Sequence, residues 1–165
     1  MRQEHPIPPL YDSSSRVLIL GSFPSVRSRE EQFFYAHPQN RFWRVLAWVF
    51  DGETPRTVEE KRRFLLQHGV ALWDVIASCE ITGSADSSIR AVRPNDLSPI
   101  LQSCPGIRIY TNGKTAYAYY QRYQLPQTGV SAGCLPSTSP ANASWTLPRL
   151  CEAWQVIRDE RNPDG

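Results

Sequence analysis

Short apolar runs along the chain predict β-strands. Residues 16–21 (RVLILG) are apolar almost throughout and end in a glycine turn, which is typical of a parallel strand buried on both faces. One later strand segment carries a single charge, Asp74, in its middle. The strand segments that follow the first one are 70–77, 107–111 and 130–135.

Segments with helical period separate these strands. A helix is expected from Asn40 through Phe50, and a second begins at Thr57, where TVEE at 57–60 has the form of a capping box, and continues to Gln67. Three more helices are expected at 96–103, 114–123 and 147–161. Alternating strands and helices predict an α/β fold in one domain, 1–165: a three-layer α/β/α sandwich around a short, mainly parallel sheet of about four strands.

Polar residues gather where these strands end. Ligand sites of parallel sheets lie beyond the carboxyl ends of the strands. That rule selects four loops as the candidate site: 22–25, 74–78, 112–113 and 137–144.

Composition narrows the class of protein. Hydrophobic residues make up 41% and charged residues 21%, as in an ordinary soluble domain. No apolar run has the length of a membrane helix, and residues 1–10 lack the apolar core of a secretory signal, so the cytoplasm is the expected location. The four cysteines form no CxxC pair and the three histidines are scattered, so we expect buried, reduced thiols and neither metal nor cofactor.

The charge balance alone does not identify a partner. Lys and Arg number 18 against 16 Asp and Glu, a net charge of +2. A local basic patch would suffice for nucleic acid, and five arginines lie between positions 16 and 44, although a solvated surface explains them equally well.

Two motifs after the first strand are more informative. The loop GSFPS at 21–25 is followed by YAHPQNRFW at 35–43, in which Asn40 opens a helix and could simply cap it. The second motif resembles the equivalent segment of mismatch-specific uracil-DNA glycosylases. Together with STSPAN at 137–142, the first loop is similar to the hypoxanthine-DNA (deoxyinosine) glycosylase branch of the uracil-DNA glycosylase superfamily, and the resemblance extends from Val17 to Ser144.

The resemblance implies a monofunctional DNA glycosylase that removes a deaminated base, hypoxanthine first and uracil second, from DNA as its partner. A mismatch-specific uracil-DNA glycosylase and a non-catalytic lesion-binding module on the same fold remain alternatives. A lyase step is not expected, because no lysine lies in a pocket-forming motif to make a Schiff base. A serine hydrolase is disfavoured by the absence of a GxSxG elbow. We also expect the protein to be a monomer.

The resemblance also assigns roles in the first two motifs. Ser22 and Phe23 contribute to the base pocket and Ser25 to DNA binding, but Phe23 stands where most relatives carry the Asp or Asn that positions water. Tyr35 falls where relatives stack an aromatic ring on the flipped base, although a core tyrosine is the alternative. Asn40 remains to hold the attacking water, with its amide oxygen accepting a hydrogen bond from that water.

Asp74 replaces the Asn with which the superfamily reads the edge of the base. An ionised carboxylate only accepts hydrogen bonds, so it would accept N1–H of hypoxanthine and oppose the N1 lone pair of adenine. Uracil N3–H would satisfy it equally. A loop or helix-cap partner, or a general base, are the other interpretations of Asp74.

The segment 137–144 matches the last motif. Many relatives carry a His at the position of Ser137, where it stabilises the leaving base, and this chain does not. Backbone N–H groups with the hydroxyls of Ser137, Thr138 and Ser139 could instead contact phosphate or base. Ala141 and Asn142 fall at the tip that wedges into DNA in relatives, and both are small, which favours weakly paired lesions. Asn112-Gly113 is explained by turn chemistry, and Asp86 is assigned to an Asx-turn at the rim.

Overall fold

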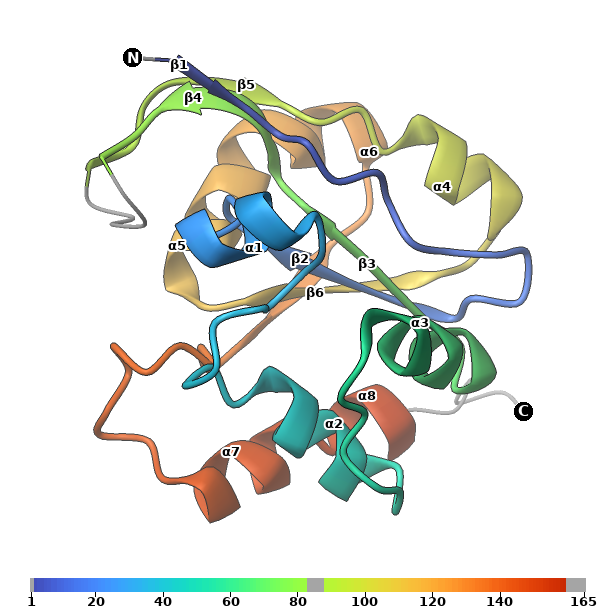
Figure 1. The fold of residues 1–165 in the computed structure, drawn as a ribbon. Helices are drawn as coiled ribbons and strands as arrows, with labels where there is room; N and C mark the ends of the chain where they lie inside the picture. Colours follow the sequence, from blue (N-terminus) through green and yellow to red (C-terminus); the bar gives the residue numbers. More distant parts are fainter. Residues whose placement is uncertain (1, 83–87, 160–165) are drawn as a thin grey trace.

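A four-stranded parallel sheet forms the centre of the molecule (Figure 1). The computed structural model describes residues 2–82 and 88–159. In spatial order the strands are β3 (Val70–Asp74), β2 (Val17–Gly21), β6 (Arg108–Asn112) and β7 (Ala132–Leu135), all parallel to their neighbours. The expected α/β sandwich around a parallel sheet of about four strands is therefore confirmed.

Helices cover both faces of this sheet, so the side chains of β2 are buried on both sides. Val17 and Ile19 pack into one apolar cluster, and Leu18 and Leu20 into another. The helices on the first side are α2 (Phe42–Val49), α3 (Val58–Gln67), α7 (Leu147–Trp154) and α8 (Val156–Asp159). Those on the second side are α4 (Ser98–Ser103), α5 (Lys114–Tyr119), the π-helix η2 (Tyr120–Gln124) and α6 (Leu125–Thr128).

The helix boundaries follow local chemistry. Thr57 caps α3 with the predicted capping box, since its hydroxyl accepts from Glu60 N–H and the Glu60 carboxylate reaches back to the Thr57 N–H. The expected helix 114–123 is instead a continuous helical stretch of three types, α5, η2 and α6. A short helix, α1 (Val26–Glu31), was not predicted, and Ser25 caps it.

A second, antiparallel sheet corrects the predicted strand 70–77. That segment is two strands, β3 and β4 (Ile76–Glu80), and β4 leaves the parallel sheet to pair with β1 (Arg2–Glu4) and β5 (Arg90–Pro94). Neither β1 nor β5 has an apolar alternation in the sequence, which is why neither was predicted.

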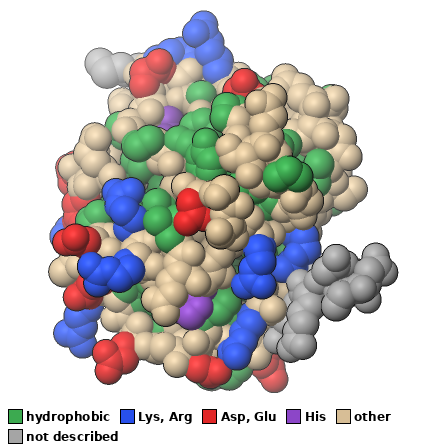
Figure 2. Space-filling model, turned by 90° about the vertical axis from the view of Figure 1, so that its right-hand side faces the viewer, with side chains coloured by type: hydrophobic (Ala, Val, Ile, Leu, Met, Phe, Trp, Pro, Cys, Tyr) green, Lys and Arg blue, Asp and Glu red, His purple; other side chains and the backbone are tan. Residues whose placement is uncertain are grey.

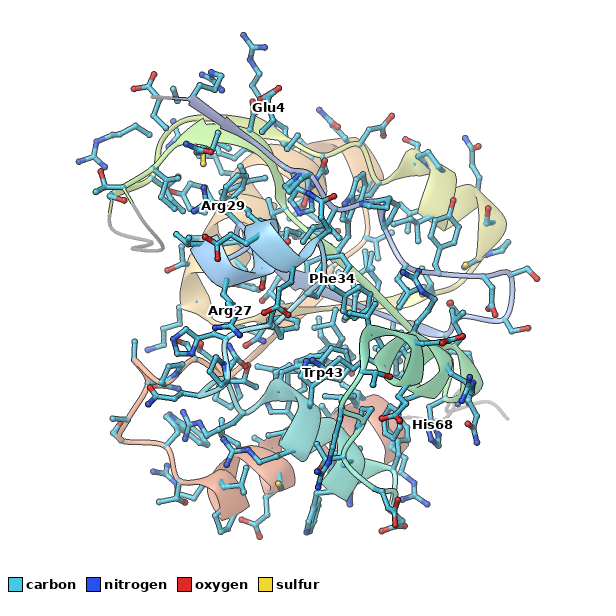
Figure 3. The ribbon with its side chains drawn as sticks, in the orientation of Figure 1. Glu4, Arg27, Arg29, Phe34, Trp43 and His68 are labelled. Carbon is cyan, nitrogen blue, oxygen red and sulfur yellow. The ribbon has the colours of Figure 1, made fainter. Side chains whose placement is uncertain are left out.

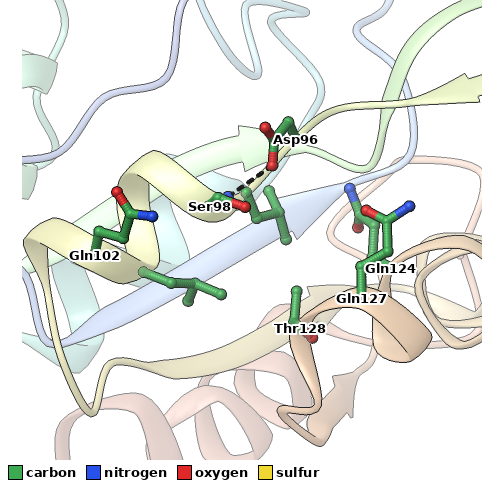
Figure 4. Close-up of a pocket in the computed structure, with 8 residues that line it drawn as sticks. Asp96, Ser98, Gln102, Gln124, Gln127 and Thr128 are labelled. Carbon is green, nitrogen blue, oxygen red and sulfur yellow. Dashed lines mark hydrogen bonds between the residues drawn. The ribbon is translucent and has the colours of Figure 1, made fainter.

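Buried amides hold the chain where it changes sheets, directly after Asp74. The side-chain amide of Asn95 donates to the carbonyls of Asp74 at 2.9 Å and Ile76 at 3.2 Å. Gln124 donates in turn to the carbonyl of Val75 at 3.1 Å and to that of Asn95 at 2.8 Å. Figure 4 shows Gln124 beside a small cavity between α4 and α6. These contacts fix the main chain of Asp74 from behind the sheet.

The cysteine expectation needs one correction. Cys79, Cys104 and Cys151 are buried free thiols, as predicted, but Cys134 is an exposed free thiol because β7 lies at the sheet edge. Among the described residues, no helix combines the length and the apolar character needed to span a membrane.

Candidate active site

The carboxyl ends of the parallel strands enclose a cavity of about 340 Å³, within the range of small-ligand sites. Tyr35, Asn40 and Asp74 all line it, so three residues from distant segments face one space. The other predicted residues in its wall are Ser22, Phe23, Ser25, Ser137, Thr138, Ser139 and Ala141. Phe34, which the sequence did not single out, also lines it, as does Asn112 from the predicted loop 112–113.

Asp74 ends β3 and is 4% exposed. Its Oδ2 lies 2.7 Å from Nε2 of His5, and the two side chains are 5% and 3% exposed respectively. Its other oxygen lies over Gly21, where a Cβ would be 2.4 Å from Oδ1. Gly21 is therefore needed because the carboxylate occupies the space of a side chain, in addition to the turn expected from the sequence.

Tyr35 reaches the same point from the loop before α2. Its backbone has φ of 51°, a strained conformation for a residue other than glycine, and Trp43 Nε1–H holds its carbonyl at 3.1 Å. The ring stacks on Phe42 with centroids 4.0 Å apart, and the hydroxyl is buried without a well-formed hydrogen bond, with Asn112 and Asp74 as its polar neighbours. Burial first, and then the charge of Asp74, raise the pKa of Tyr35, so the hydroxyl stays protonated.

Asn40 is both a helix cap and a wall of the cavity. Its Oδ1 accepts from Phe42 N–H at 2.9 Å and from the Thr138 hydroxyl at 2.8 Å. Because two donors already occupy this oxygen, the expectation that it accepts a hydrogen bond from water is corrected. The NH2 group is the part of Asn40 that remains for a ligand.

Thr138 joins two asparagines across the cavity. It is fully buried, its N–H donates to Asn112 Oδ1 at 3.0 Å, and its hydroxyl accepts from Asn112 Nδ2 at 3.0 Å while donating to Asn40. The single hydroxyl proton of Thr138 is used inside the protein, which favours a supporting role over a phosphate contact. Next to it, Gly113 has φ of 98° and approaches Ser137 closely, as a Cβ there would lie 3.1 Å from the Ser137 Cβ.

Arg41 fastens the loop that continues from Thr138. Its guanidinium donates to the carbonyl of Ser139 at 2.9 Å, to that of Asn142 at 3.1 Å and to that of Trp145. Within the loop, Ser137 Oγ accepts from Ser139 N–H and Ser139 Oγ accepts from Ala141 N–H, each at 3.1 Å. The loop is thus folded by its own side chains and by one half-buried cation, Arg41.

The first motif forms the opposite rim. Ser25 caps α1, since its Oγ accepts from Ser28 N–H at 3.1 Å, and the Arg29 guanidinium lies 5.4 Å from the centroid of Phe23. Figure 3 shows Arg27 and Arg29 beside α1 and Phe34 in the interior below it. On the face that carries the amino ends of the strands, basic and acidic side chains are mixed on the left of the view, and several basic side chains lie together on the right (Figure 2). Among the described residues, no group of His, Cys, Asp and Glu side chains could hold a metal ion.

Comparison with known proteins agrees with this arrangement. A family model described as the uracil DNA glycosylase superfamily matches residues 8–159. The chain belongs to this superfamily.

Two relatives from Methanosarcina species are similar to this chain along most of their length. A protein of Methanosarcina acetivorans named hypoxanthine DNA glycosylase is 33% identical over 152 residues, 91% of this chain and 94% of the relative. A protein of Methanosarcina barkeri with the same name is 31% identical over 138 residues, 82% and 85% of the two chains. A solution NMR structure from Methanosarcina acetivorans, provisionally assigned as a uracil DNA glycosylase, has a TM-score of 0.80 at 32% identity. The match covers 96% of this chain and 98% of that structure.

Membership of the superfamily confirms the resemblance predicted from the sequence. Some residues of the site were nevertheless missed or interpreted differently. His5 was missed because the three histidines are scattered in the sequence and none has ligand spacing. Asn112 was explained as turn chemistry, yet it faces the cavity. Asn142, predicted at the tip, is not in the cavity wall but donates to the Ser137 carbonyl at 3.0 Å. Asp86 lies outside the described residues.

Proposed function

We propose that this chain is a monofunctional DNA glycosylase that hydrolyses the N-glycosidic bond of a deaminated base, with hypoxanthine as the first substrate and uracil as the second. The observation that carries the proposal is the convergence of Asp74, Tyr35 and two asparagines on one cavity at the carboxyl ends of the sheet. The superfamily membership and two relatives named hypoxanthine DNA glycosylase support it.

The reaction needs little proton abstraction. The bond between C1′ and the base nitrogen breaks, the water oxygen bonds to C1′, and one water proton ends on the departing base, which leaves an abasic sugar. Because the transition state of such a cleavage resembles an oxocarbenium ion, placing the water matters more than deprotonating it. A side-chain amide is adequate for that task.

Asn40 is the proposed catalytic residue. Its NH2 would donate to the water oxygen, and the second lone pair of the water would then attack C1′. The contacts from Phe42 N–H and Thr138 to Asn40 Oδ1 fix the direction in which the NH2 points. Asn112, held by the same Thr138, offers a second amide beside the base.

Recognition is assigned to the other end of the cavity. Asp74 Oδ1 would accept N1–H of hypoxanthine or N3–H of uracil, while Tyr35, Ser22 and Phe23 enclose the ring. DNA contacts are proposed for Ser25, Ser137, Ser139, Ala141 and Asn142, where backbone groups and hydroxyls face the rim. For Thr138 the proposed contribution is indirect, through the asparagines that it holds.

A strand-cleavage assay tests this function. Duplexes with one deoxyinosine or one deoxyuridine would be incubated with the protein and then treated with alkali, which cleaves only at abasic sites. We expect cleavage at deoxyinosine, weaker cleavage at deoxyuridine, and none without alkali because no lyase step occurs. Asn40→Ala should lower the single-turnover rate about 100-fold or more while DNA retardation in a gel persists.

The same assay separates the alternatives. Retardation of lesion duplexes with every base still attached would identify a lesion-binding module, and a preference for mispaired deoxyuridine would identify a mismatch-specific uracil-DNA glycosylase. Asp96→Asn is a matched control, because Asp96 is exposed, accepts a hydrogen bond from Ser98 N–H and lies outside this cavity. Undiminished activity of Asn40→Ala would remove Asn40 from the mechanism. That the chain is a single domain, is a monomer and acts in the cytoplasm stays a prediction. Light scattering would test whether it is a monomer.

A further inference from the structure

The amino-terminal segment places a histidine behind the base-reading carboxylate. His5 N–H donates to the Ala77 carbonyl at 2.7 Å, next to the pairing of β1 with β4. The imidazole packs edge-on to Phe23 and Trp73, with centroids 5.9 and 6.2 Å away. His5 lies ahead of residues 8–159, the part of the chain that the superfamily model matches. It is therefore a contribution from outside the matched region to the centre of the site.

The hydrogen bonds around this ring determine its tautomer. The Ile7 backbone N–H donates to His5 Nδ1 at 3.2 Å, so Nδ1 must carry a lone pair. In the neutral ring the proton is then on Nε2, which donates to Asp74 Oδ2 at 2.7 Å. An imidazolium, or a ring protonated at Nδ1, would set two hydrogens against each other at Ile7. The arrangement makes Asp74 Oδ2 an acceptor and matches a carboxylate.

We infer that His5 is a positioning and specificity-determining residue, whose Nε2–H holds Asp74 as a carboxylate with Oδ1 turned toward the base. This inference rests on the proposed glycosylase function. With Oδ2 engaged by His5, the oxygen that remains beside Gly21 and Tyr35 offers lone pairs only. His5 thus converts a residue that could donate or accept into one that only accepts.

That conversion selects the class of base. Hypoxanthine presents N1–H to Oδ1, whereas adenine presents a lone pair that a carboxylate repels. Guanine also carries N1–H, so its exclusion must come from the shape of the cavity around the 2-amino group. The pair of His5 and Asp74 therefore accounts for discrimination between hypoxanthine and adenine, the base from which hypoxanthine arises by deamination.

Removing the donor should change the protonation of the carboxylate. The titratable and charged groups recorded around it are His5 and Tyr35, with Arg29 of α1 above the adjacent Phe23 ring. A buried carboxylate without its donor favours the protonated form, in which it presents O–H to the N1–H of hypoxanthine. His5→Leu should then lose activity on deoxyinosine at neutral pH and recover part of it as the pH is raised.

Three variants test the inference. We expect His5→Leu to lower the single-turnover rate on deoxyinosine by about 10- to 100-fold at neutral pH and to shift the pH–rate profile to higher pH. His5→Gln should restore most of the rate, because its Nε2 can donate from nearly the same position. The control is Arg2→Ala, which removes the hydrogen bonds of Arg2 to Ser78 and Ala91 and leaves the pair of His5 and Asp74 in place.

Several outcomes would overturn it. Wild-type rates in His5→Leu, equal losses in the Leu and Gln variants, or an equal loss in Arg2→Ala would each show that His5 only packs the amino-terminal segment. A readout independent of activity is the ¹⁵N spectrum of the imidazole, where the Nε2–H tautomer is expected. An imidazolium or an Nδ1–H tautomer in that spectrum would contradict the inference about His5, whether or not the protein releases a base. The expected tautomer in a protein that releases no base would contradict only the proposed function.

Discussion

The two sides of the cavity are built differently. The strand side consists of Gly21 and Asp74 at the ends of adjacent strands, with His5 behind them, and one buried pair fixes its chemistry. The loop side consists of Asn40, Arg41, Thr138 and the segment 139–145, which hydrogen bonds between side chains and backbone hold together. On the strand side, the parallel sheet fixes the positions of the residues. The loop side depends on a few side chains, and no regular secondary structure would hold the loop if they were removed.

In the proposed function, this difference assigns the two tasks of a glycosylase to different kinds of structure. The proposed base selection requires a fixed carboxylate, and a strand end fixes it well. Cleavage and DNA contact require a loop that meets a deformable duplex, and such a loop is held by contacts that can be tuned one at a time. The variants below disturb one side and leave the other intact.

Gly21→Ala should have the largest effect, and it acts on the strand side. The new Cβ would lie 2.4 Å from Asp74 Oδ1 and 3.2 Å from Tyr35 Oη, so the carboxylate must move. We expect the rate on deoxyinosine to fall about 100-fold and the free energy of unfolding to fall by about 1–3 kcal/mol. Gly52→Ala is the control, because its Cβ would meet only Phe64 at 3.2 Å. An unchanged rate would show that the position of Asp74 is not critical.

Arg41→Lys should come next, and it acts on the loop side. A lysine cannot reach three carbonyls with a planar fork, so the segment 139–145 should loosen. The expected losses are about 30-fold in rate and about 2–3 kcal/mol in the free energy of unfolding, measured by urea denaturation. Arg44→Lys, an exposed change on the same helix, should alter neither quantity. Equal behaviour of the two variants would contradict the assignment of Arg41.

Thr138→Val should have a smaller effect on the same side. The valine is nearly isosteric but gives up the donor to Asn40 and the acceptor for Asn112. We expect about a tenfold lower rate and a free energy of unfolding lower by about 1–3 kcal/mol. Thr138→Ser keeps the hydroxyl and should retain most of the activity. If Thr138→Ser slows the enzyme and Thr138→Val does not, the methyl group rather than the hydroxyl is what matters.

Tyr35→Phe should change stability least. Because the buried Tyr35 hydroxyl makes no well-formed hydrogen bond, its removal should relieve a desolvation cost and raise the free energy of unfolding at neutral pH by about 1 kcal/mol. Burial raises the pKa of Tyr35 above its ordinary value of 10.0, so the wild type keeps its full stability below pH 10.0 and loses it progressively at higher pH, where only the unfolded state ionises. Wild type should therefore lose stability faster than the variant above that pH, as thermal melts would show; parallel curves would contradict the buried assignment.

The sequence predicted the strand side better than the loop side. The four polar loops follow from apolar runs and glycine turns, so Gly21 and Asp74 were both expected near the site, although the strand of Asp74 was expected to continue to residue 77 and ends at Asp74. His5 could not be found, because its partner lies 69 residues away and nothing local marks the contact. The capping of α2 by Asn40 was weighed as an alternative to catalysis, and the structure shows that the cap leaves the NH2 for a ligand. The antiparallel sheet was missed because β1 and β5 are short and polar.

The shortness of β1 has a consequence for the dynamics of the enzyme. Among the described residues, Arg2–Glu4 pair with β4 and His5 adds one backbone hydrogen bond to Ala77, so this short edge can open without disturbing the parallel sheet, and His5 would leave Asp74 when it does. The share of molecules with a complete site then equals the share with a docked amino terminus, which reduces the apparent affinity for the lesion accordingly. Amide hydrogen exchange at His5, compared with Leu18 inside β2, would measure that share directly.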